Sequence, residues 1–179
     1  MTRLVALLGS INTGGNRIKM ADLRDALTNA GFANVATVTA SGNVLFDGDP
    51  GQADTYRKQM AELLTNQFGI DTFAVIASRE DLIATMDDSP FAATGADNFV
   101  HVHFLEHDPD SAAFDTLEAD QAGRGPEKLA RGQGVLHIDY VEGVGRSKLT
   151  GDFITRRLSC RGTARNIRSI RRIVEAMES

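Results

Sequence analysis

Apolar residues recur with two different spacings through the first 77 residues of the chain, and these spacings predict six elements. A continuous apolar run at residues 3–8 predicts a strand buried on both faces, because such a strand shows no alternation. Each stretch with helical spacing is followed by a glycine, Gly31 or Gly69, which can adopt the left-handed conformation that ends a helix. The predicted elements are a strand at 3–8, a helix at 20–30, strands at 34–39 and 44–46, a helix at 56–68 and a strand at 72–76.

The order strand, helix, strand, strand, helix, strand is typical of the ferredoxin-like pattern. The second half has a similar outline without a residue-level repeat, and it opens with a short helix for which Ser78 and Asp81 form a carboxylate variant of the capping box. The elements predicted after it are a strand at 99–105, a helix at 109–117, a poorly patterned strand at 127–131, a strand at 135–141, and helices at 149–158 and 164–177. We therefore expect an α+β fold of two ferredoxin-like βαββαβ-type subdomains packed together, residues 1–77 and 78–179, with a basic C-terminal helix.

The composition is that of a globular chain with a substantial core, since 42% of its 179 residues are apolar and 24% are charged. No apolar run reaches the ~20 residues that cross a bilayer. The run near the N-terminus is also shorter than the ~7–15 residues of a signal peptide's apolar region. Cys160 is the only cysteine, which leaves no internal disulfide and no thiolate zinc cluster. We expect a cytoplasmic protein with no membrane contact and no cofactor.

The net charge of −5 is unevenly distributed along the chain. Residues 1–142 hold 10 Lys and Arg against 21 Asp and Glu, whereas residues 143–179 hold 9 against 3. A basic tail on an acidic body indicates either an anionic partner or docking of the tail on the body.

The last predicted helix is basic and amphipathic. Its apolar side is formed by Ile167, Ile170, Val174 and Met177. Arg165, Arg168 and Arg172 lie on the opposite side, and Arg161 continues their line upstream. Such a face is either the solvated outer surface of a docked helix or a footprint for phosphate or nucleic acid.

Residues 9–16 form a glycine-rich connection between the first strand and the first helix. Loops of this kind can direct backbone N–H groups at an anion, and Lys19 lies nearby. The spacing matches neither the P-loop GxxxxGK[ST] nor GxGxxG. The alternative interpretation is that Gly14 and Gly15 only shape a long connection. The tripeptide at 41–43 is explained by a hairpin turn, because Gly and Asn tolerate positive φ.

His101 and His103 are separated by one residue of a predicted strand and therefore point to one face. His137 and Asp139 have the same relation on a later strand. If the two strands were neighbours, four potential ligands would share a face, and histidine is the commonest metal ligand. The alternative is a solvated polar face. We therefore predict no metal site, with the three histidines as the candidates if those strands pair.

Seven short blocks lie along nearly the whole chain: residues 7–15 (LLGSINTGG), 20–23 (MADL), 31–32 (GF), 41–46 (SGNVLF), 89–91 (SPF), 145–149 (GRSKL) and 163–166 (TARN). Together and in this order they resemble the bacterial family DUF1697, a domain of unknown function. The resemblance implies an α+β fold with ferredoxin-like subdomains, and no established activity, substrate or cofactor. This chain has Gly9-Ser10 and Ile167-Arg168-Ser169 where the family usually has Arg-Gly and Trp-Asn-Thr.

The blocks supply the small polar residues, glycines and cations that a phosphate pocket needs. The candidate ligand-binding residues are Asn12, Gly14, Gly15, Lys19, Ser41, Asn43, Ser147, Lys148, Arg165 and Asn166. The first hypothesis is therefore binding of a phosphate-bearing ligand, either a small molecule such as a nucleotide or a nucleic acid, through the glycine-rich loop and the Arg-rich C-terminal region. A small hydrolase or transferase, metal-assisted through the three histidines, is the second hypothesis, and a protein-interaction module is the third. Whether the protein is an enzyme stays open at this stage.

Overall fold

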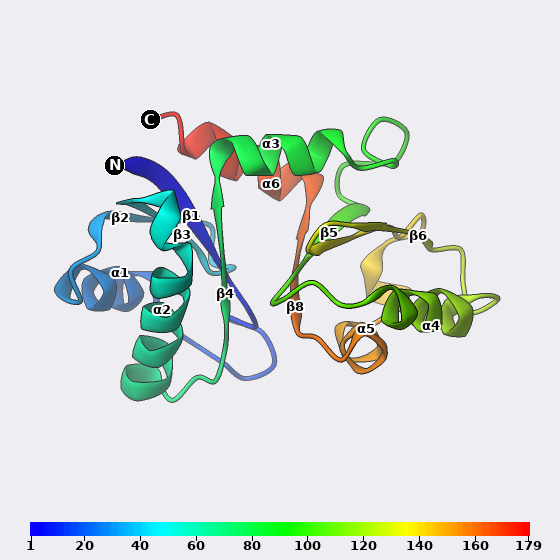
Figure 1. The fold of residues 1–179 in the computed structure, drawn as a ribbon, viewed down its shortest axis with the longest axis horizontal. Coiled ribbons are helices and arrows are strands. Elements are labelled where there is room, and N and C mark those ends of the chain that lie inside the picture. The colour runs from blue at the N-terminus through cyan, green and yellow to red at the C-terminus, as the bar shows by residue number, and fades with distance from the viewer. The chain divides into compact units, whose positions relative to one another are not determined.

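The computed structural model describes all residues from Met1 to Ser179. The chain divides into two compact units: a first unit of residues 1–82 with 172–179, and a second unit of residues 83–171. Each unit contains one four-stranded antiparallel sheet, and the chain has six α-helices in all (Figure 1). The α+β class expected from the sequence is thereby confirmed. None of the helices combines the length and the apolar character that crossing a bilayer requires.

The first unit is built around a central strand, β1. Its elements are β1 (Thr2–Leu8), α1 (Met20–Asn29), β2 (Ala33–Val38), β3 (Asn43–Gly48), the short 3₁₀ helix η1 (Pro50–Gln52), α2 (Ala53–Phe68) and β4 (Ala74–Ser78). The strand order is β2-β3-β1-β4, and β1 pairs antiparallel with both β3 and β4. A strand in this position is buried on both faces, which explains the continuous apolar run in its sequence.

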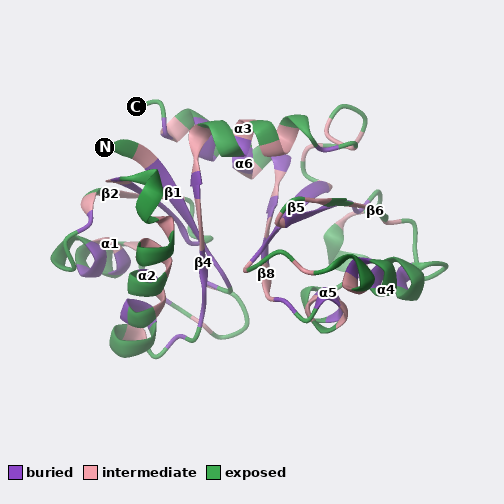
Figure 2. Cartoon of the chain, in the orientation of Figure 1, coloured by how far each residue is buried: buried purple, intermediate pink, exposed green.

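One face of this sheet carries the core of the first unit. The core joins alternate residues of β1, such as Leu4 and Ala6, to the apolar sides of α1 and α2, such as Leu23 and Met60. The side of α2 that does not face this core is exposed (Figure 2). The two helices thus bury one stripe each against the sheet, as their helical spacing predicts.

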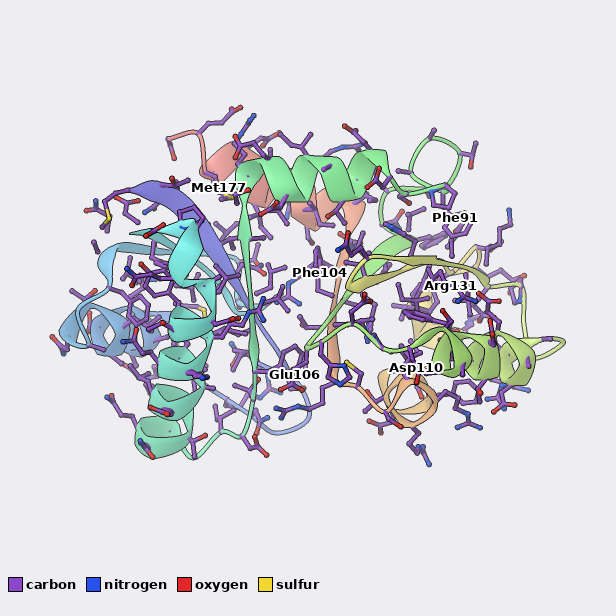
Figure 3. All side chains as sticks on the ribbon, in the orientation of Figure 1. Phe91, Phe104, Glu106, Asp110, Arg131 and Met177 are labelled. Carbon is purple, nitrogen blue, oxygen red and sulfur yellow. The ribbon has the colours of Figure 1, made fainter.

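The second unit has the same strand order. Its elements are β5 (Val100–Leu105), α4 (Ser111–Gln121), β6 (Lys128–Gly132), β7 (Val135–Asp139), the short 3₁₀ helix η2 (Val144–Arg146), α5 (Gly151–Leu158) and β8 (Gly162–Asn166). The sheet order is β6-β7-β5-β8, with β5 in the centre and every pair antiparallel. Helices α4 and α5 pack their Phe and Leu side chains, such as Phe114 and Phe153, on one face of this sheet. Arg131 of β6, labelled in Figure 3, pairs with Asp115 and lies over the Phe114 ring of α4.

Two helices belong in part to each unit, because the division falls inside them. Helix α3 (Arg79–Asp87) contains the boundary after Leu82, and α6 (Ile167–Ala176) contains the boundary after Arg171. The capping box predicted before α3 is confirmed: Ser78 N donates to Asp81 Oδ2 at 2.8 Å, and Asp81 N donates to Ser78 Oγ at 3.1 Å.

The C-terminal region differs from the sequence prediction at one element. Residues 164–166, predicted as the start of the last helix, form the end of strand β8 instead. The strand pairs with the open edge of β5, where Arg165 lies opposite Val102. Backbone hydrogen bonds to that edge outweigh a local helical pattern of a few residues. The helix itself begins only at Ile167.

Candidate functional site

A hollow of about 470 Å³ lies in the first unit beside the glycine-rich loop. Its lining residues are Asn12, Arg17, Ile18, Lys19, Asp22 and Phe68. They come from three places: the loop between β1 and α1, the first turn of α1, and the last residue of α2. Of these residues, the sequence predicted Asn12 and Lys19 as ligand-binding.

The loop that forms one side of the hollow has a fixed and unusual backbone conformation. Ser10, Asn12, Gly14 and Gly15 all have positive φ, at 52°, 56°, 57° and 95°. Glycine and asparagine adopt this region readily, whereas the serine adopts it at a cost. A Cβ added at Gly14 or Gly15 would meet no atom within 4 Å, and both residues are exposed.

Asn12 holds this loop in place. Its Nδ2 donates to the Ala40 carbonyl at 2.8 Å, and its Oδ1 accepts from Ile18 N at 3.0 Å. The side chain thus links the loop to the turn before β3 and to the approach to α1. Asn12 lines the hollow, but its amide is already engaged within the protein.

Two cations line the hollow. Arg17 is exposed, and its Nη1 donates to the Asn12 carbonyl at 3.3 Å, which draws the guanidinium back along the loop. Lys19 is exposed and occupies the N-cap position of α1 without a side-chain cap hydrogen bond. A lysine cannot accept from the first amides of the helix, so these amides have no side-chain acceptor at the cap. Two positive charges beside the positive end of a helix favour an anion here.

The other lining residues supply different chemistry. Asp22, in the first turn of α1, is exposed and places one carboxylate beside the two cations. Ile18 is buried, and Phe68 is half-buried against the core of the first unit. Arg17, Asp22 and Phe68 were not among the residues predicted from the sequence. Phe68 was assigned to the apolar face of its helix, and only the fold brings its ring to the loop.

The turn at 41–43 is explained by the hairpin that it closes. Asn43 is fully buried, and its Nδ2 donates to the Val38 carbonyl at 3.0 Å and to Thr39 Oγ1 at 3.2 Å. Gly42 has a φ of 80°, and a Cβ there would lie 2.9 Å from Ile11 Cβ. Ser41 is exposed on the same turn.

Four predicted site residues lie in the second unit, while the other six lie in the first. Ser147 donates to Glu127 and accepts from Leu149 N at 3.0 Å, so its hydroxyl holds the loop before α5. Lys148 is exposed. These two neighbours in sequence therefore differ in role: one fixes the local backbone, and the other presents a charge to solvent.

Arg165 and Asn166 also make internal contacts. Arg165 is buried in β8, where its Nη1 donates to Thr163 Oγ1 at 2.6 Å and to the Ala164 carbonyl at 2.9 Å. Burial lowers the pKa of this guanidinium to about 10. Asn166 Oδ1 accepts from Ser169 N at 2.8 Å and caps α6.

The sequence predicted one exposed row of arginines formed by Arg161, Arg165, Arg168 and Arg172. This prediction is wrong for the first two. Arg161 precedes β8 and forms two hydrogen bonds of 2.9 Å with the carboxylate of Glu106, which Figure 3 labels. Arg165 is buried in the strand. Arg168 and Arg172 are the exposed arginines that remain from that line, whereas the predicted apolar side of the helix is buried.

A smaller hollow of about 240 Å³ lies at the other side of the first unit, around Tyr56 and Asp47. The Asp47 carboxylate accepts from Asn34 Nδ2 and from Arg3 Nη1 at 3.1 Å. The hydrogen bond from Asn34, and then that from Arg3, hold the pKa of this carboxyl below its ordinary value. The Asp47 carboxylate and the Tyr56 hydroxyl, which accepts from Asp49 N at 3.0 Å, are thus engaged within the protein, and no cationic side chain lines this hollow.

Comparison with known protein families gives a match over most of the chain. The family described as "Protein of unknown function (DUF1697)" matches residues 1–137. The chain belongs to the DUF1697 family. The match includes the glycine-rich loop, the turn at 41–43 and every residue that lines the 470 Å³ hollow. It ends before the blocks at 145–149 and 163–166.

The solved structures include one that is similar to this DUF1697 chain over its full length. It is described as the structure of conserved bacterial protein SP0830 from Streptococcus pneumoniae. The two share 20% sequence identity with a TM-score of 0.73, and the similarity covers 100% of this chain and 99% of that one. At this identity the likeness establishes the fold. None of the curated proteins matches the chain.

The three candidate histidines of this DUF1697 chain, His101, His103 and His137, are buried and do not share one face of the sheet. Strands β5 and β7 are neighbours, but His137 lies opposite Val102, whereas His101 and His103 lie opposite Ile138 and Leu136. Directly opposed residues point to the same face of a sheet, so His137 is on the other face from His101 and His103. The two strands do pair, but the expectation that His101, His103, His137 and Asp139 would then share one face is wrong. No group of three or more His, Cys, Asp or Glu side chains is placed to hold a metal ion.

Cys160 is also an internal residue. It is buried, and its Sγ donates to the carbonyl oxygens of His107 and Arg161. Burial raises the pKa of this thiol despite the arginines nearby in sequence. A protonated, buried thiol of this kind is a poor nucleophile.

Proposed function

We propose that this DUF1697 protein binds a small phosphate-bearing ligand in the hollow between the glycine-rich loop and the start of α1. The observation that carries the proposal is the placement of Arg17 and Lys19 together on one hollow of about 470 Å³. A cavity of this size falls within the range of about 300–1,000 Å³ that is usual for small-molecule sites.

The local electrostatics support an anionic ligand. The Lys19 carbonyl accepts from Leu23 N, whereas its exposed side chain forms no cap hydrogen bond, so the ammonium is available. Gly14 and Gly15 are not among the lining residues, but they lie in the same loop, and their exposed backbone leaves space around it free of side chains. Phosphate oxygens accept hydrogen bonds from both ammonium and guanidinium groups.

A small molecule is favoured over a nucleic acid because the C-terminal basic line is interrupted. Arg165 is buried, and Arg161 is paired with Glu106. Arg171, next to the exposed Arg172, is paired with Asp97. Binding to a nucleic-acid backbone depends on several phosphates being neutralised at once. The exposed Arg168 and Arg172 do not supply such a track alone.

We also infer that both units are variants of the ferredoxin-like pattern. The inference is supported by the element order within each unit, and by the common strand order β2-β3-β1-β4 and β6-β7-β5-β8. In both units the two central strands pair antiparallel, and two helices pack on one face of the sheet. In the first unit this pattern fixes the position of the hollow, because it places the end of α2 beside the loop that follows β1.

The test is a calorimetric titration of the full chain with inorganic phosphate at low and moderate salt. We expect binding that weakens with salt, since exposed charges are screened. Lys19→Ala is expected to weaken binding about ten-fold or more, because hydrogen bonds to charged groups contribute roughly 1.5–3 kcal/mol. Arg17→Ala is expected to act in the same direction.

Lys58→Ala is the matched control, because Lys58 is an exposed lysine of the same unit on α2 and does not line the hollow. This variant should bind phosphate like the unmodified protein. Absence of binding at millimolar phosphate, or equal loss in Lys19→Ala and Lys58→Ala, would refute the proposal.

A further inference from the structure

We infer that the phosphate-bearing ligand is a nucleoside monophosphate, an inference that rests on the function proposed above and narrows it. The hollow combines three kinds of group: two cations, one carboxylate and an aromatic ring. A nucleoside monophosphate presents the complement of all three, namely a phosphate, ribose hydroxyls and a flat base.

The aromatic wall is formed by Phe68. This residue is the last of α2, and the helix ends there because Gly69 adopts the left-handed conformation at φ 66°. Phe68 is partly buried against the core of the first unit, and it is also one of the residues that line the hollow. A flat base can stack on such a ring, which a sugar phosphate without a base cannot do.

The carboxylate of Asp22 distinguishes between phosphate ligands. Asp22 is exposed and forms no ion pair, so its oxygens can accept from a ribose hydroxyl or from an amino group of a base. It also partly offsets the charge of Arg17 and Lys19, leaving a small positive balance. That balance suits one phosphate better than a chain of two or three.

The size and position of the hollow agree with this ligand class. At about 470 Å³ it exceeds what an inorganic phosphate needs, and its polar and apolar walls are different residues. Arg17 and Lys19 belong to the loop and the N-cap of α1, whereas Phe68 belongs to the end of α2. A ligand that satisfies both walls must be anionic at one end and flat and apolar at the other.

The experiment compares adenosine monophosphate, ribose phosphate and inorganic phosphate as ligands of the full chain by calorimetry. We expect adenosine monophosphate to bind about ten-fold or more tightly than ribose phosphate, as one stacked base contributes on this scale. Phe68→Leu keeps an apolar side chain but removes the ring. It should reduce binding of the nucleotide to the level of ribose phosphate and leave ribose phosphate unchanged. Phe68→Tyr keeps the ring and should restore the preference.

Asp22→Asn adds a second readout, because it removes a charge and keeps the shape. We expect it to strengthen binding of inorganic phosphate and to weaken the preference for the nucleotide over inorganic phosphate. Lys19→Ala should weaken all three ligands together.

The outcomes separate the two proposals. Equal affinities for adenosine monophosphate and ribose phosphate in the unmodified protein would overturn the nucleotide inference, while phosphate binding would stand. If none of the three ligands binds, both fall. Should Phe68→Leu fail to fold, the ratio of the two affinities in the unmodified protein and in Phe68→Tyr still decides.

Discussion

His103 is a buried imidazole without a hydrogen bond to either ring nitrogen. It lies on the central strand β5, and its ring covers the backbone of Gly162 on the neighbouring strand. Burial lowers the pKa of His103 to about 4, and the positive charges of His101 and Arg165 act in the same direction. The residue is therefore neutral at physiological pH and serves as part of the core.

This burial predicts a loss of stability in mild acid. The unfolded chain protonates His103 near its ordinary pKa of 6.5, whereas the folded chain does so only near 4. The stabilisation is therefore fully present above pH 6.5 and falls as the pH drops from there toward 4, where the unfolded state binds more protons. A difference of this size corresponds to about 3 kcal/mol. Urea unfolding at a series of pH values should show it.

The variant His103→Leu should flatten this part of the profile, because it removes the titrating group and keeps an apolar side chain of similar size. Burial also lowers the pKa of His101 and of His137, so part of the slope should remain. The exposed His107 provides the control, and His107→Gln should leave the profile as it is. An unchanged slope in His103→Leu would show that His103 is not the group responsible.

The histidines also show what the sequence can and cannot predict about single residues. Alternation along a strand correctly placed His101 and His103 on one face. Their relation to His137 depends on the register between β5 and β7, and a shift of one residue exchanges the faces. That register is set by packing and by the intervening connection, which no local pattern records. For the same reason the sequence indicated Asn12 and Lys19 as candidates but not Phe68, which lines the same hollow only because of the fold.

At the scale of elements, strand β8 was the one missed by sequence reasoning. Residues 164–166 continue the spacing of the helix that follows, so a local reading merges them with it. In the structure the strand ends at Asn166, and the side chain of Asn166 caps α6, which begins at the next residue. Strand β6, poorly patterned in sequence, is nevertheless formed because it pairs with β7. Both cases are tertiary pairing that overrides local preference.

The cap at Asn166 can be tested directly. Asn166→Ala removes the acceptor for Ser169 N and should destabilise the protein by about 1 kcal/mol. Asn166→Asp retains a good cap and should cost little. Chemical denaturation of both variants measures the difference. If Asn166 were instead needed only for a ligand, both variants would unfold like the unmodified protein and differ only in binding.

The contact between β5 and β8 leads to a second prediction at this scale. A methyl group at Gly162 would overlap Cδ2 and Nε2 of the His103 ring, so Gly162→Ala should destabilise the protein by several kcal/mol, on the order of a severe core substitution. In a His103→Ala background the same change should cost much less, since the ring is gone. A double-mutant cycle measures the coupling. Equal cost in both backgrounds would place the strain elsewhere.

At the scale of the whole molecule, two units share one strand order without sharing a residue-level repeat. Strand order follows from which segments can bury an apolar face, and many sequences satisfy that requirement. The sequence could therefore predict two similar halves. It could not show that the end of the chain belongs to the first unit again. Residues 172–179 are part of that unit, although the whole second unit, residues 83–171, separates them from residues 1–82 in sequence. Within that unit Glu178 pairs with Arg79.

The returning segment leads to the last prediction. Deleting residues 172–179 removes three buried apolar side chains, Ile173, Val174 and Met177. Each such side chain contributes roughly 1.5–3 kcal/mol, so the loss should be on the order of 5 kcal/mol. At ~2–4 °C per kcal/mol, the melting temperature should fall by about 10 °C or more. Hydrogen exchange should show lost protection first in β1, the central strand of the first unit, and later in β5.

Glu178→Ala is the control for this deletion, because it removes the ion pair to Arg79 and keeps the three apolar side chains. The pair is partly exposed to solvent, with 58% of the Glu178 side chain accessible, so its loss should cost no more than about 1 kcal/mol. If the deletion destabilised the protein no more than Glu178→Ala does, burial of the three apolar side chains would contribute little to stability. A simultaneous loss of protection in β1 and β5 would mean that the two units unfold as one, and that the division of the chain has no counterpart in its stability.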